Sequence, residues 1–421
     1  MSASADWLAV FEALKRIYTE EGFSNIAINE AVYKHKGCKD SFVRAFTKGV
    51  IRDTTRLDFI IGKLAVNGLK SIKNRSLIIL RMGIYAIESL DSVPNHAAVN
   101  QAVSLAKKVA KGTDKFINAI LREYLRKETS IEIPDDLSVK YSFHPTIVNL
   151  IKRQYGDEAK KIIAELNKPS PLILRANMTK TTVQNLIFML TDRRIKAEPV
   201  EDSANAVIVY GGEIIGTDIY KEGYCTVQSL SSIKAIEALS PEPGSLVLDM
   251  CSAPGGKATA IAEMMGDIGK ITACDIHDHR LELIEASARR LDLKCISTEP
   301  ADGTVTRDDF LEKFDYVLAD VPCSGLGTCG SKPEIKLRPI QEKNPELRKI
   351  QIAILQNALK YVKEGGYVEY STCTLNKEEN ESVVKECIKS CSFARIVEMQ
   401  TILPYNNLVG FFYAIIQKKP H

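Results

Sequence analysis

Two cysteines stand where strand-like runs of the chain end, and they could carry nucleophilic chemistry. Cys323 lies in ADVPCSGLG, residues 319–327, and Cys373 lies in STCT, residues 371–374. A thiol can attack an electrophile once it is deprotonated, it can assist another nucleophile, or it can be a small buried apolar side chain. The sequence of each stretch taken alone leaves these three interpretations open.

The spacing of the two cysteines favours a shared site. Cys323 lies three residues beyond Asp320, and Cys373 lies three residues beyond Tyr370, at the ends of two successive strand-like runs. If these runs are neighbouring parallel strands, about 4.8 Å apart, both thiols face one cleft. Pro322 fixes its own backbone φ, which stiffens the approach to Cys323.

Two thiols in one cleft suit the methylation of a cytosine ring at C5. A thiolate adds to C6 of the ring and makes C5 electron-rich, and a base must then remove the C5 proton so that the enzyme can eliminate. One cysteine can attack while another group assists release. The residues alone do not say which cysteine attacks.

A glycine-containing turn earlier in the chain is typical of a cofactor loop. The stretch LVLDMCSAPGGKATAIAEM, residues 246–264, predicts a strand, a turn and a helix. It matches neither the GxGxxG pattern of dinucleotide-binding folds nor the GxxxxGK[ST] pattern of phosphate-binding loops. Gly255 and Gly256 allow a ligand to approach the backbone closely, and the start of the helix offers free N–H groups to an anion such as a carboxylate.

Three acidic residues follow successive predicted strands beyond this loop. Asp275 ends the second strand, Asp302 lies past the third, and Asp320 ends the fourth. An acid placed like Asp275 accepts ribose hydroxyls in doubly wound nucleotide folds, although a single acid there can also be a turn residue. Since such folds bind ligands at the carboxyl ends of their strands, the three acids together predict a ligand site.

The elements that must hold these residues alternate regularly from about residue 226 onward. Strand-like runs separated by helical stretches predict a parallel doubly wound sheet. The runs are residues 246–250, 271–275, 295–299, 314–320 and 367–370. The last two strand-like runs, ARIVEM and FFYAIIQ, are joined by a helix-poor segment, which predicts an antiparallel last strand.

The first part of the chain is helical almost throughout. In residues 6–128 apolar residues recur at helical spacing, with breaks that contain Gly, Asn or Pro. After the linker IEIPDDL, helical stretches mix with strand-like runs at PLILRANM, VIVYGG and EGYCTVQ. We therefore predict an all-α domain over residues 1–130, a small α+β domain over 131–225 and an α/β domain over 226–421.

The charge of the chain is unevenly distributed. Residues 1–130 hold 21 Lys and Arg against 13 Asp and Glu, and the remaining residues hold 35 against 40. A basic helical domain joined to a near-neutral catalytic body suits an enzyme that binds a polyanion, since neutralising phosphates supplies much of the affinity for nucleic acid. A basic face that is merely solvated is the alternative.

The composition of the chain and the spacing of its cysteines indicate which classes of protein it can belong to. The 421 residues are 45% hydrophobic and 26% charged, and no stretch reaches the roughly 18 apolar residues that cross a bilayer. The start of the chain lacks the order of a signal peptide, so we expect a cytoplasmic protein that contacts no membrane. The ten cysteines are then expected to stay reduced. The pair Cys387 and Cys391 has no partner at zinc-site spacing, so we expect no metal.

Several stretches of the sequence resemble known RNA methyltransferases. DMCSAPGGKAT, DVPCSGLGT with KPEIKLR, and EYSTCTLNKEEN resemble the signatures of the RNA cytosine-C5 methyltransferases. SFVRAFTKGVIRDTTRLDFII, LRMGIYAIESLDSVPNHAAVNQAVSLAKK and FINAILREYLR resemble the NusB-like helical domain of the bacterial Sun/RsmB enzymes, which methylate small-subunit ribosomal RNA. YSFHPTIVNLIKRQYG, PLILRANM and LVGFFYAII also match, so the resemblance spans nearly the whole chain. It implies a NusB-like domain, a small α+β domain and a Rossmann-like class I methyltransferase domain.

The resemblance implies a role for each residue that could react. In this family the thiol of the TC motif attacks and the thiol of the PC motif assists product release, which makes Cys373 the nucleophile and Cys323 the release cysteine. DNA cytosine methyltransferases use the PC cysteine as the nucleophile instead. Asp320 is implied to lie between the cofactor and the target base, and Lys257 to reach the base or Asp320. For Lys257, a solvated lysine at the start of a helix is the alternative.

The resemblance also implies the cofactor, S-adenosylmethionine, and its site. Asp275 is expected at the ribose, Asp302 near the adenine, and Asp320 beside the methyl donor. The loop residues expected to hold the cofactor are Cys251, Ser252, Ala253, Pro254, Gly255, Gly256 and Lys257.

The sequence departs from the family pattern at three places. A pair of arginines usually precedes the P-[DE]-I-K motif, whereas this chain has CGSK at residues 329–332. Val409 stands where an acid commonly precedes GFF, and VQSLSS, residues 227–232, replaces the usual QDEAS pattern. These departures bear on substrate preference and activity rather than on the fold.

We predict an S-adenosylmethionine-dependent methyltransferase that modifies C5 of a cytidine in small-subunit ribosomal RNA. We expect small-subunit ribosomal RNA as its partner and a monomer as its oligomeric state. The same chemistry on transfer RNA is one alternative. A catalytically idle RNA-binding factor in ribosome assembly is the other.

Overall fold

The computed structural model describes residues 4–20 and 22–420, and its chain divides into two compact units. Unit 1 is Met1–Lys168 together with Cys329–Ile340. Unit 2 is Pro169–Thr328 together with Gln341–His421. In the described part of the chain, no helix is long and apolar enough to cross a membrane.

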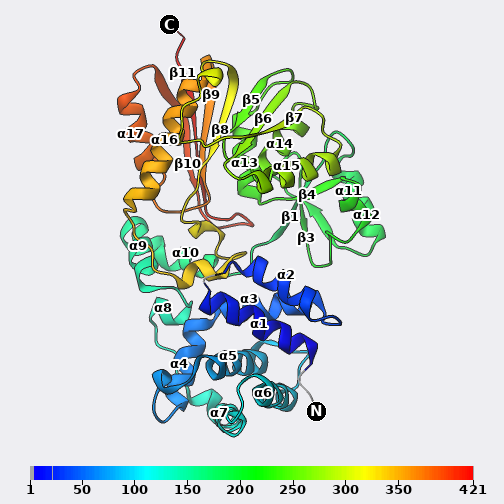
Figure 1. Ribbon diagram of the computed structural model, residues 1–421, viewed down its shortest axis with the longest axis vertical. Coiled ribbons are helices and arrows are strands. Elements are labelled where there is room, and N and C mark those ends of the chain that lie inside the picture. Colours follow the sequence, from blue (N-terminus) through cyan, green and yellow to red (C-terminus); the bar gives the residue numbers. More distant parts are fainter. Residues whose placement is uncertain (1–3, 21, 421) are drawn as a thin grey trace. The chain divides into compact units, whose positions relative to one another are not determined.

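Unit 1 is helical, and its helices between residues 5 and 127 pack around one apolar core (Figure 1). Its helices are α1 Ala5–Thr19, α2 Ser24–Lys34, α3 Asp40–Arg52, α4 Thr54–Leu64, α5 Asn74–Ser89, α6 Asn95–Val109, α7 Asp114–Lys127, α8 Leu137–Lys140, α9 Pro145–Tyr155 and α10 Ala159–Leu166. In α3, Val43, Phe46 and Val50 recur at helical spacing and are fully buried. The Phe46 ring packs edge-on against Trp7 of α1, 5.2 Å between centroids.

A segment from the second half of the chain completes unit 1. Within Cys329–Ile340, residues Pro333–Leu337 form a short 3-10 helix that packs against the helices of this unit. The Glu334 carboxylate accepts from the backbone N–H of Ser24 at 3.0 Å, where α2 begins. The Lys336 ammonium is fully buried and donates to the backbone carbonyl of Tyr141 at 2.7 Å. The CGSK departure therefore lies in a segment that is folded into unit 1.

Unit 2 begins with a four-stranded antiparallel sheet in the order β2-β3-β1-β4. Its strands are β1 Leu172–Ala176, β2 Ala197–Pro199, β3 Ala206–Val209 and β4 Cys225–Val227. Successive residues alternate between the faces: Leu174 packs on the side of α11, Val183–Asp192, and Ile173 on the side of α13, Leu230–Leu239. A short helix, α12 Asp218–Lys221, precedes β4. The strand-like runs predicted here correspond to β1, β3 and β4.

A seven-stranded sheet forms the larger part of unit 2, in the order β10-β11-β9-β8-β5-β6-β7. The strands are β5 Leu246–Asp249, β6 Lys270–Asp275, β7 Ile296–Pro300, β8 Phe314–Asp320, β9 Val362–Thr372, β10 Ala394–Ile402 and β11 Phe411–Lys418. Strands β5 to β9 pair in parallel, whereas β11 is antiparallel to both β9 and β10. The predicted multidomain fold, with a doubly wound sheet and an antiparallel last strand, is confirmed.

Helices cover both faces of this sheet (Figure 1). Helices α14 Gly256–Met264 and α15 Asp278–Leu291 join α13 on one face, and α16 Pro345–Tyr361 and α17 Glu381–Ser390 lie on the other. Val247 points to the first group of helices and Leu248 to the second, as the two-residue period of a strand requires. With both faces buried, the residues at the ends of the parallel strands are the part of the sheet left to bind a ligand.

Candidate active site

The two cysteines meet at the ends of neighbouring strands. Strand β8 pairs in parallel with β9, and Asp320 lies opposite Ser371 in the register. The expectation that these strands are adjacent is confirmed. Each strand then continues to its cysteine, and the Sγ atoms of Cys323 and Cys373 lie 3.3 Å apart.

A pair of glycines holds the loop of Cys373 against the loop of Cys323. The backbone N–H of Gly327 donates to the carbonyl of Cys373 at 2.9 Å. A Cβ atom added to Gly327 would lie 1.7 Å from the carbonyl oxygen of Gly410, so the two backbones touch where side chains are absent. Gly410 belongs to the LVGFF stretch, and no local sequence pattern predicts that it reaches the cysteine loops.

A buried carboxylate ties the Cys323 loop to the residues beyond Cys373. Glu379 accepts from the backbone N–H of Ser324 at 2.8 Å and from its hydroxyl at 2.6 Å. Gln351 of α16 donates to the carbonyl of Pro322 at 2.9 Å. Glu379 stands within EYSTCTLNKEEN, but its role could not be predicted from the sequence because its partner lies 55 residues away in the chain.

Cys323 holds its proton more strongly than an ordinary thiol does. The hydrogen bond to Cys373, together with burial, raises the pKa of Cys323 well above that of an ordinary thiol, and the carboxylates of Glu379 and Asp320 act in the same direction. Cys323 is therefore a thiol that can donate to the sulfur of Cys373.

Lys257, at the start of α14, forms an ion pair with Asp320 at the end of β8. The Nζ to Oδ2 distance is 2.6 Å, and the lysine is 8% exposed. Burial alone would lower the pKa of Lys257, but the charges of Asp320 and Glu369 outweigh burial and raise it. The lysine thus stays charged and reaches Asp320, so the alternative of a solvated lysine is wrong.

Two further carboxyl groups lie near this ion pair, and the sequence analysis missed both. Asp249 ends β5 and Glu369 lies in β9, and both are buried. Among the described residues, neither carboxyl has a hydrogen-bond partner for its side-chain oxygens. Burial raises the pKa of each to about 7. Asp249 could have been found from its strand-end position, which it shares with Asp275 and Asp320.

The glycine turn connects β5 to α14 as predicted. Gly255 has φ +95°, a left-handed conformation that favours glycine, and a Cβ there would lie 3.2 Å from Cα of Ile284. The backbone N–H of Ser252 donates to the carbonyl of Cys274 at 2.8 Å, which fixes the turn to β6. Ala253 and Pro254 are joined by a cis peptide bond, and burial raises the pKa of the Cys251 thiol well above its usual value.

Asp275 is held at the end of β6 by an arginine. The carboxyl group is 4% exposed and lies 3.2 Å from Arg280, which also donates to the carbonyl of Ala253 at 3.2 Å. The arginine therefore joins the acid to the glycine turn. The sequence analysis did not single out Arg280, although it lies only five residues after Asp275 in the chain.

Asp302, beyond β7, lines a small recess that is partly open to solvent. Asp302 Oδ1 accepts from the backbone N–H of Thr304 at 2.9 Å and from its hydroxyl at 2.7 Å. The rest of the wall is mostly apolar and is formed by Leu248, Met250, Cys274, Ala301, Gly303, Val305, Arg307, Phe310 and Tyr361. An apolar slot with a carboxylate at its wall suits a flat heterocycle that donates a hydrogen bond.

Two of the departures from the family pattern contact one another. The hydroxyl of Ser231, in VQSLSS, donates to the carbonyl of Val409 at 2.7 Å and accepts from its backbone N–H at 3.0 Å. Next to them, Leu230 and Leu408 pack in one apolar cluster. The two departures are thus one local change beside Gly410.

The sheet order brings the strand-end acids into one row. Asp320, Asp249 and Asp275 end β8, β5 and β6, which are consecutive in the sheet, and Asp302 follows the next strand, β7. A glycine turn after the first parallel strand, acids at the following strand ends and an antiparallel last strand define an S-adenosylmethionine-dependent methyltransferase.

Comparisons with known proteins identify the family. The model of the 16S rRNA methyltransferase RsmB/F family matches residues 236–416, that of the NusB family residues 8–126, and that of the RsmF/B-like ferredoxin-like domain residues 144–213. A Bacillus subtilis (strain 168) protein named probable ribosomal RNA small subunit methyltransferase B is 31% identical over 97% of this chain and 97% of its own length. A Synechocystis protein of the same name is 33% identical over 97% and 98%.

The chain belongs to the RsmB/F family of methyltransferases, and its cofactor is S-adenosylmethionine. The solved structure of PH0851 has the same fold, with a TM-score of 0.84 over 99% of this chain and 100% of that chain at 23% identity. The family, the fold class and the cofactor expected from the sequence are thereby confirmed.

Proposed function

We propose that this methyltransferase modifies C5 of a cytidine in 16S ribosomal RNA through a covalent bond between a cysteine and C6 of the base. The observation that carries this proposal is the pair of thiols, Cys323 and Cys373, 3.3 Å apart at the ends of adjacent strands. A single nucleophile would suffice for the addition. A second thiol beside it suits a reaction in which the covalent bond between the enzyme and its product must also be broken.

The two thiols take different roles in this proposal. Cys373 attacks C6, and S-adenosylmethionine supplies the methyl group when bound. A base then removes the C5 proton, the bond from C6 to Cys373 breaks, and the electron pair returns to the Cys373 sulfur. Cys323, whose pKa is raised by its hydrogen bond to Cys373 and by burial, keeps a proton close to that sulfur and assists the release.

Asp320 and Lys257 position the base and the methyl donor. Asp320 ends β8 three residues before Cys323, and its ion pair with Lys257 fixes the carboxylate between the glycine turn and the thiols. In the proposed complex Asp320 contacts both the methyl donor and the base. Lys257 orients Asp320 through this ion pair.

The remaining strand-end acids and the glycine turn hold the cofactor in this proposal. The turn from Cys251 to Lys257 receives the amino-acid part, Asp275 accepts the ribose hydroxyls, and Asp302 lies at the adenine. Support comes from the free N–H groups at the start of α14 and from the apolar recess beside Asp302.

RNA binding is assigned to the front of the chain. Residues 1–130 carry a formal excess of positive charge, and the relatives from Bacillus subtilis and Synechocystis are named for the small-subunit ribosomal RNA. We assign RNA binding to residues 1–130, RNA positioning to residues 131–225 and methyl transfer to residues 226–421. The bases are expected to be presented singly, because a base that is modified at a ring carbon must leave its stack.

The test is a comparison of three cysteine variants on 16S RNA. Cys373→Ala should form no 5-methylcytidine. Cys323→Ala should accumulate protein covalently bound to RNA, seen as a slow band on a denaturing gel. Cys391→Ala changes a half-buried thiol just after α17 and should behave as the wild type. Turnover with normal product release by Cys323→Ala would overturn the two-thiol assignment.

Bisulfite mapping of total RNA from cells with and without the gene identifies the substrate. A 5-methylcytidine lost only from 16S RNA supports the proposal. Loss of such a mark only from transfer RNA would replace it with the first alternative. A wild-type protein that binds no S-adenosylmethionine by calorimetry would indicate the idle assembly factor.

A further inference from the structure

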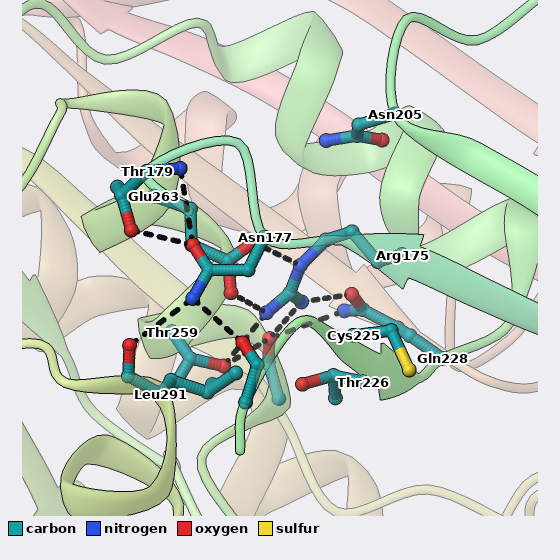
Figure 2. Close-up of polar contacts among 12 residues, drawn as sticks. Arg175, Asn177, Thr179, Asn205, Cys225, Thr226, Gln228, Thr259, Glu263 and Leu291 are labelled. Atoms are coloured by element: carbon teal, nitrogen blue, oxygen red, sulfur yellow. Dashed lines mark hydrogen bonds and ion pairs between the residues drawn. The ribbon is translucent and has the colours of Figure 1, made fainter. Parts of the chain in front are cut away.

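A fully buried arginine of the four-stranded sheet reaches into the start of α14. Arg175, in β1, is 1% exposed. Its guanidinium forms two parallel hydrogen bonds of 2.8 Å to the Glu263 carboxylate of α14 (Figure 2). It also donates to the Thr259 hydroxyl at 3.0 Å and to the side-chain amide oxygen of Gln228. Every partner but Gln228 lies in the helix that follows the glycine turn.

The contact that matters for the cofactor is to the backbone of Gly256. Arg175 donates to this carbonyl at 2.8 Å, and the amide of Gln228 donates to the same oxygen at 3.3 Å. Gln228 follows β4 directly. Two side chains of the four-stranded sheet region therefore converge on one carbonyl of the predicted cofactor turn.

Fixing this carbonyl fixes the direction of the next N–H group. The peptide unit between Gly256 and Lys257 is planar and trans, so its N–H points away from its carbonyl. That N–H is one of the four at the start of α14 that have no partner within the helix. Holding the Gly256 carbonyl from one side aims the Lys257 N–H to the opposite side, and the same peptide carries the Lys257 side chain toward Asp320.

A gain in stability alone is a poor explanation for a buried ion pair between two parts of a chain. Taking both charges out of water offsets most of their attraction, and apolar side chains of similar volume give comparable stability. What an arginine provides in addition is a fixed fork of donors. Here one donor of that fork is used on the backbone of the turn rather than on the carboxylate.

We propose that Arg175, with Gln228, is a positioning residue for the S-adenosylmethionine site. In this proposal the four-stranded sheet forms part of the cofactor site, in addition to any role in placing RNA. The inference rests on the assignment of the Cys251–Lys257 turn to the cofactor. It does not depend on which base is methylated or on which cysteine attacks.

Arg290 of α15 provides a matched control. It is also an arginine that joins the four-stranded sheet region to a helix of the larger sheet. It donates to the carbonyls of Tyr220 at 2.7 Å and Cys225 at 2.9 Å, and to the Thr226 hydroxyl at 3.0 Å. None of these three contacts is to the glycine turn or to α14.

The experiment measures S-adenosylmethionine binding by calorimetry in the full-length protein. Arg175→Lys keeps a positive charge for Glu263 but cannot reach all partners of the fork. The double variant Arg175→Met with Glu263→Leu removes both charges and leaves no unpaired carboxylate, so it should fold. Both variants should weaken binding about five- to tenfold, as expected for losing a hydrogen bond from a charged donor. Arg290→Lys should bind as the wild type.

Steady-state kinetics separate positioning from a general loss of structure. The Arg175 variants should raise the KM for S-adenosylmethionine while the KM for RNA stays at the wild-type value. Hydrogen exchange should show faster exchange of the amides at the start of α14. Wild-type cofactor affinity in both Arg175 variants would overturn the proposal, and so would an equal loss of affinity in Arg290→Lys.

Failure of this inference is distinguishable from failure of the proposed function. If Cys373→Ala still methylated RNA, the covalent mechanism would be wrong, yet the cofactor affinities of the Arg175 and Arg290 variants would still decide the role of Arg175. If the Arg175 variants bound the cofactor normally, the role of the thiols would be untouched.

Discussion

Asp249 and Glu369 are buried carboxyl groups whose protonation should change within the working pH range. Burial raises the pKa of both to about 7, and Lys257 and Asp320 are the charged groups that face them. In the folded protein both carboxyls hold protons that they would release at about pH 4 in the unfolded chain. Folding therefore takes up protons between about pH 4 and 7, and this contribution to stability is present at low pH and lost as pH rises toward 7.

Glu369→Gln tests this directly. The variant cannot ionise at this position, so its stability relative to the wild type should increase as pH rises from 5 to 8. The expected slope is at most about 1.4 kcal/mol per pH unit, the value for one proton. Urea unfolding of both proteins across this range measures it. A stability difference that stays constant with pH would show that Glu369 is already ionised in the folded protein at pH 5.

Sequence reasoning found the residues that carry chemistry more readily than those that hold them. Cys323, Cys373 and Asp320 were identifiable because each stands at or just beyond the end of a strand in a recognisable motif. Arg175 and Glu379 were not, because their partners lie 88 and 55 residues away in the chain. A contact between residues so far apart in the chain depends on how whole helices and strands pack. A local sequence pattern contains no information about that packing.

At the scale of elements, the positions of the two thiols depend on a contact between two segments of the chain. The loop after β8 and the segment before β11 touch through Gly327 and Gly410, and the same Gly327 N–H holds the carbonyl of Cys373. The separation of the thiols therefore depends on a contact between two glycines, one of which binds the backbone of Cys373.

Gly327→Ala should separate the loops and disable methyl transfer. The added Cβ would overlap the Gly410 carbonyl, so one backbone must move. We expect kcat to fall about a hundredfold, the scale seen when reacting groups are displaced by about 1 Å, while the affinity for S-adenosylmethionine is unchanged. Gly62→Ala in α4 is the control, because its Cβ would meet Leu69 at an ordinary 3.9 Å. Normal kcat in Gly327→Ala would show that the contact does not position the cysteines.

The strands were largely predictable and the exceptions have physical causes. Runs such as 314–320 alternate between apolar clusters on both faces and lie between helical stretches, so they were recognised as strands of the sheet. Strand β2, Ala197–Pro199, was missed because it has three residues, is largely exposed and ends in proline. Its pairing with β3 is a property of the folded sheet and has no local signature.

At the scale of the whole molecule, the segment Cys329–Ile340 joins a unit that is otherwise formed by Met1–Lys168. The sequence predicts this segment as part of the third domain, residues 226–421. The assignment of methyl transfer to residues 226–421 stays a proposal. In the structure the segment packs with the helical unit through Glu334 and Lys336. No pattern in the sequence indicates this, because KPEIKLR has the composition of an exposed loop.

Lys336→Ala should destabilise unit 1 while leaving cofactor binding intact. The ammonium donates to the Tyr141 carbonyl and lies over the Phe143 ring, and its removal leaves that carbonyl buried and a cavity beside the ring. We expect a loss of about 1–3 kcal/mol, measured by hydrogen exchange of α9 and α10. Lys332→Ala, an exposed lysine of the same segment, should change stability by less than about 0.5 kcal/mol. Equal effects of the two substitutions would contradict the assignment.

The return of the chain into unit 1 has a consequence for how the protein is made. A ribosome releases residues in order, and N-terminal domains generally fold first. Here the helical unit lacks its 3-10 segment until the chain has been synthesised past Ile340, long after Lys168 has emerged. At about 5–20 residues per second, that interval lasts roughly ten to thirty seconds. During it, the apolar surface that Pro333–Leu337 will cover is open to chaperones, and the helical unit gains its final stability only once most of the second unit exists.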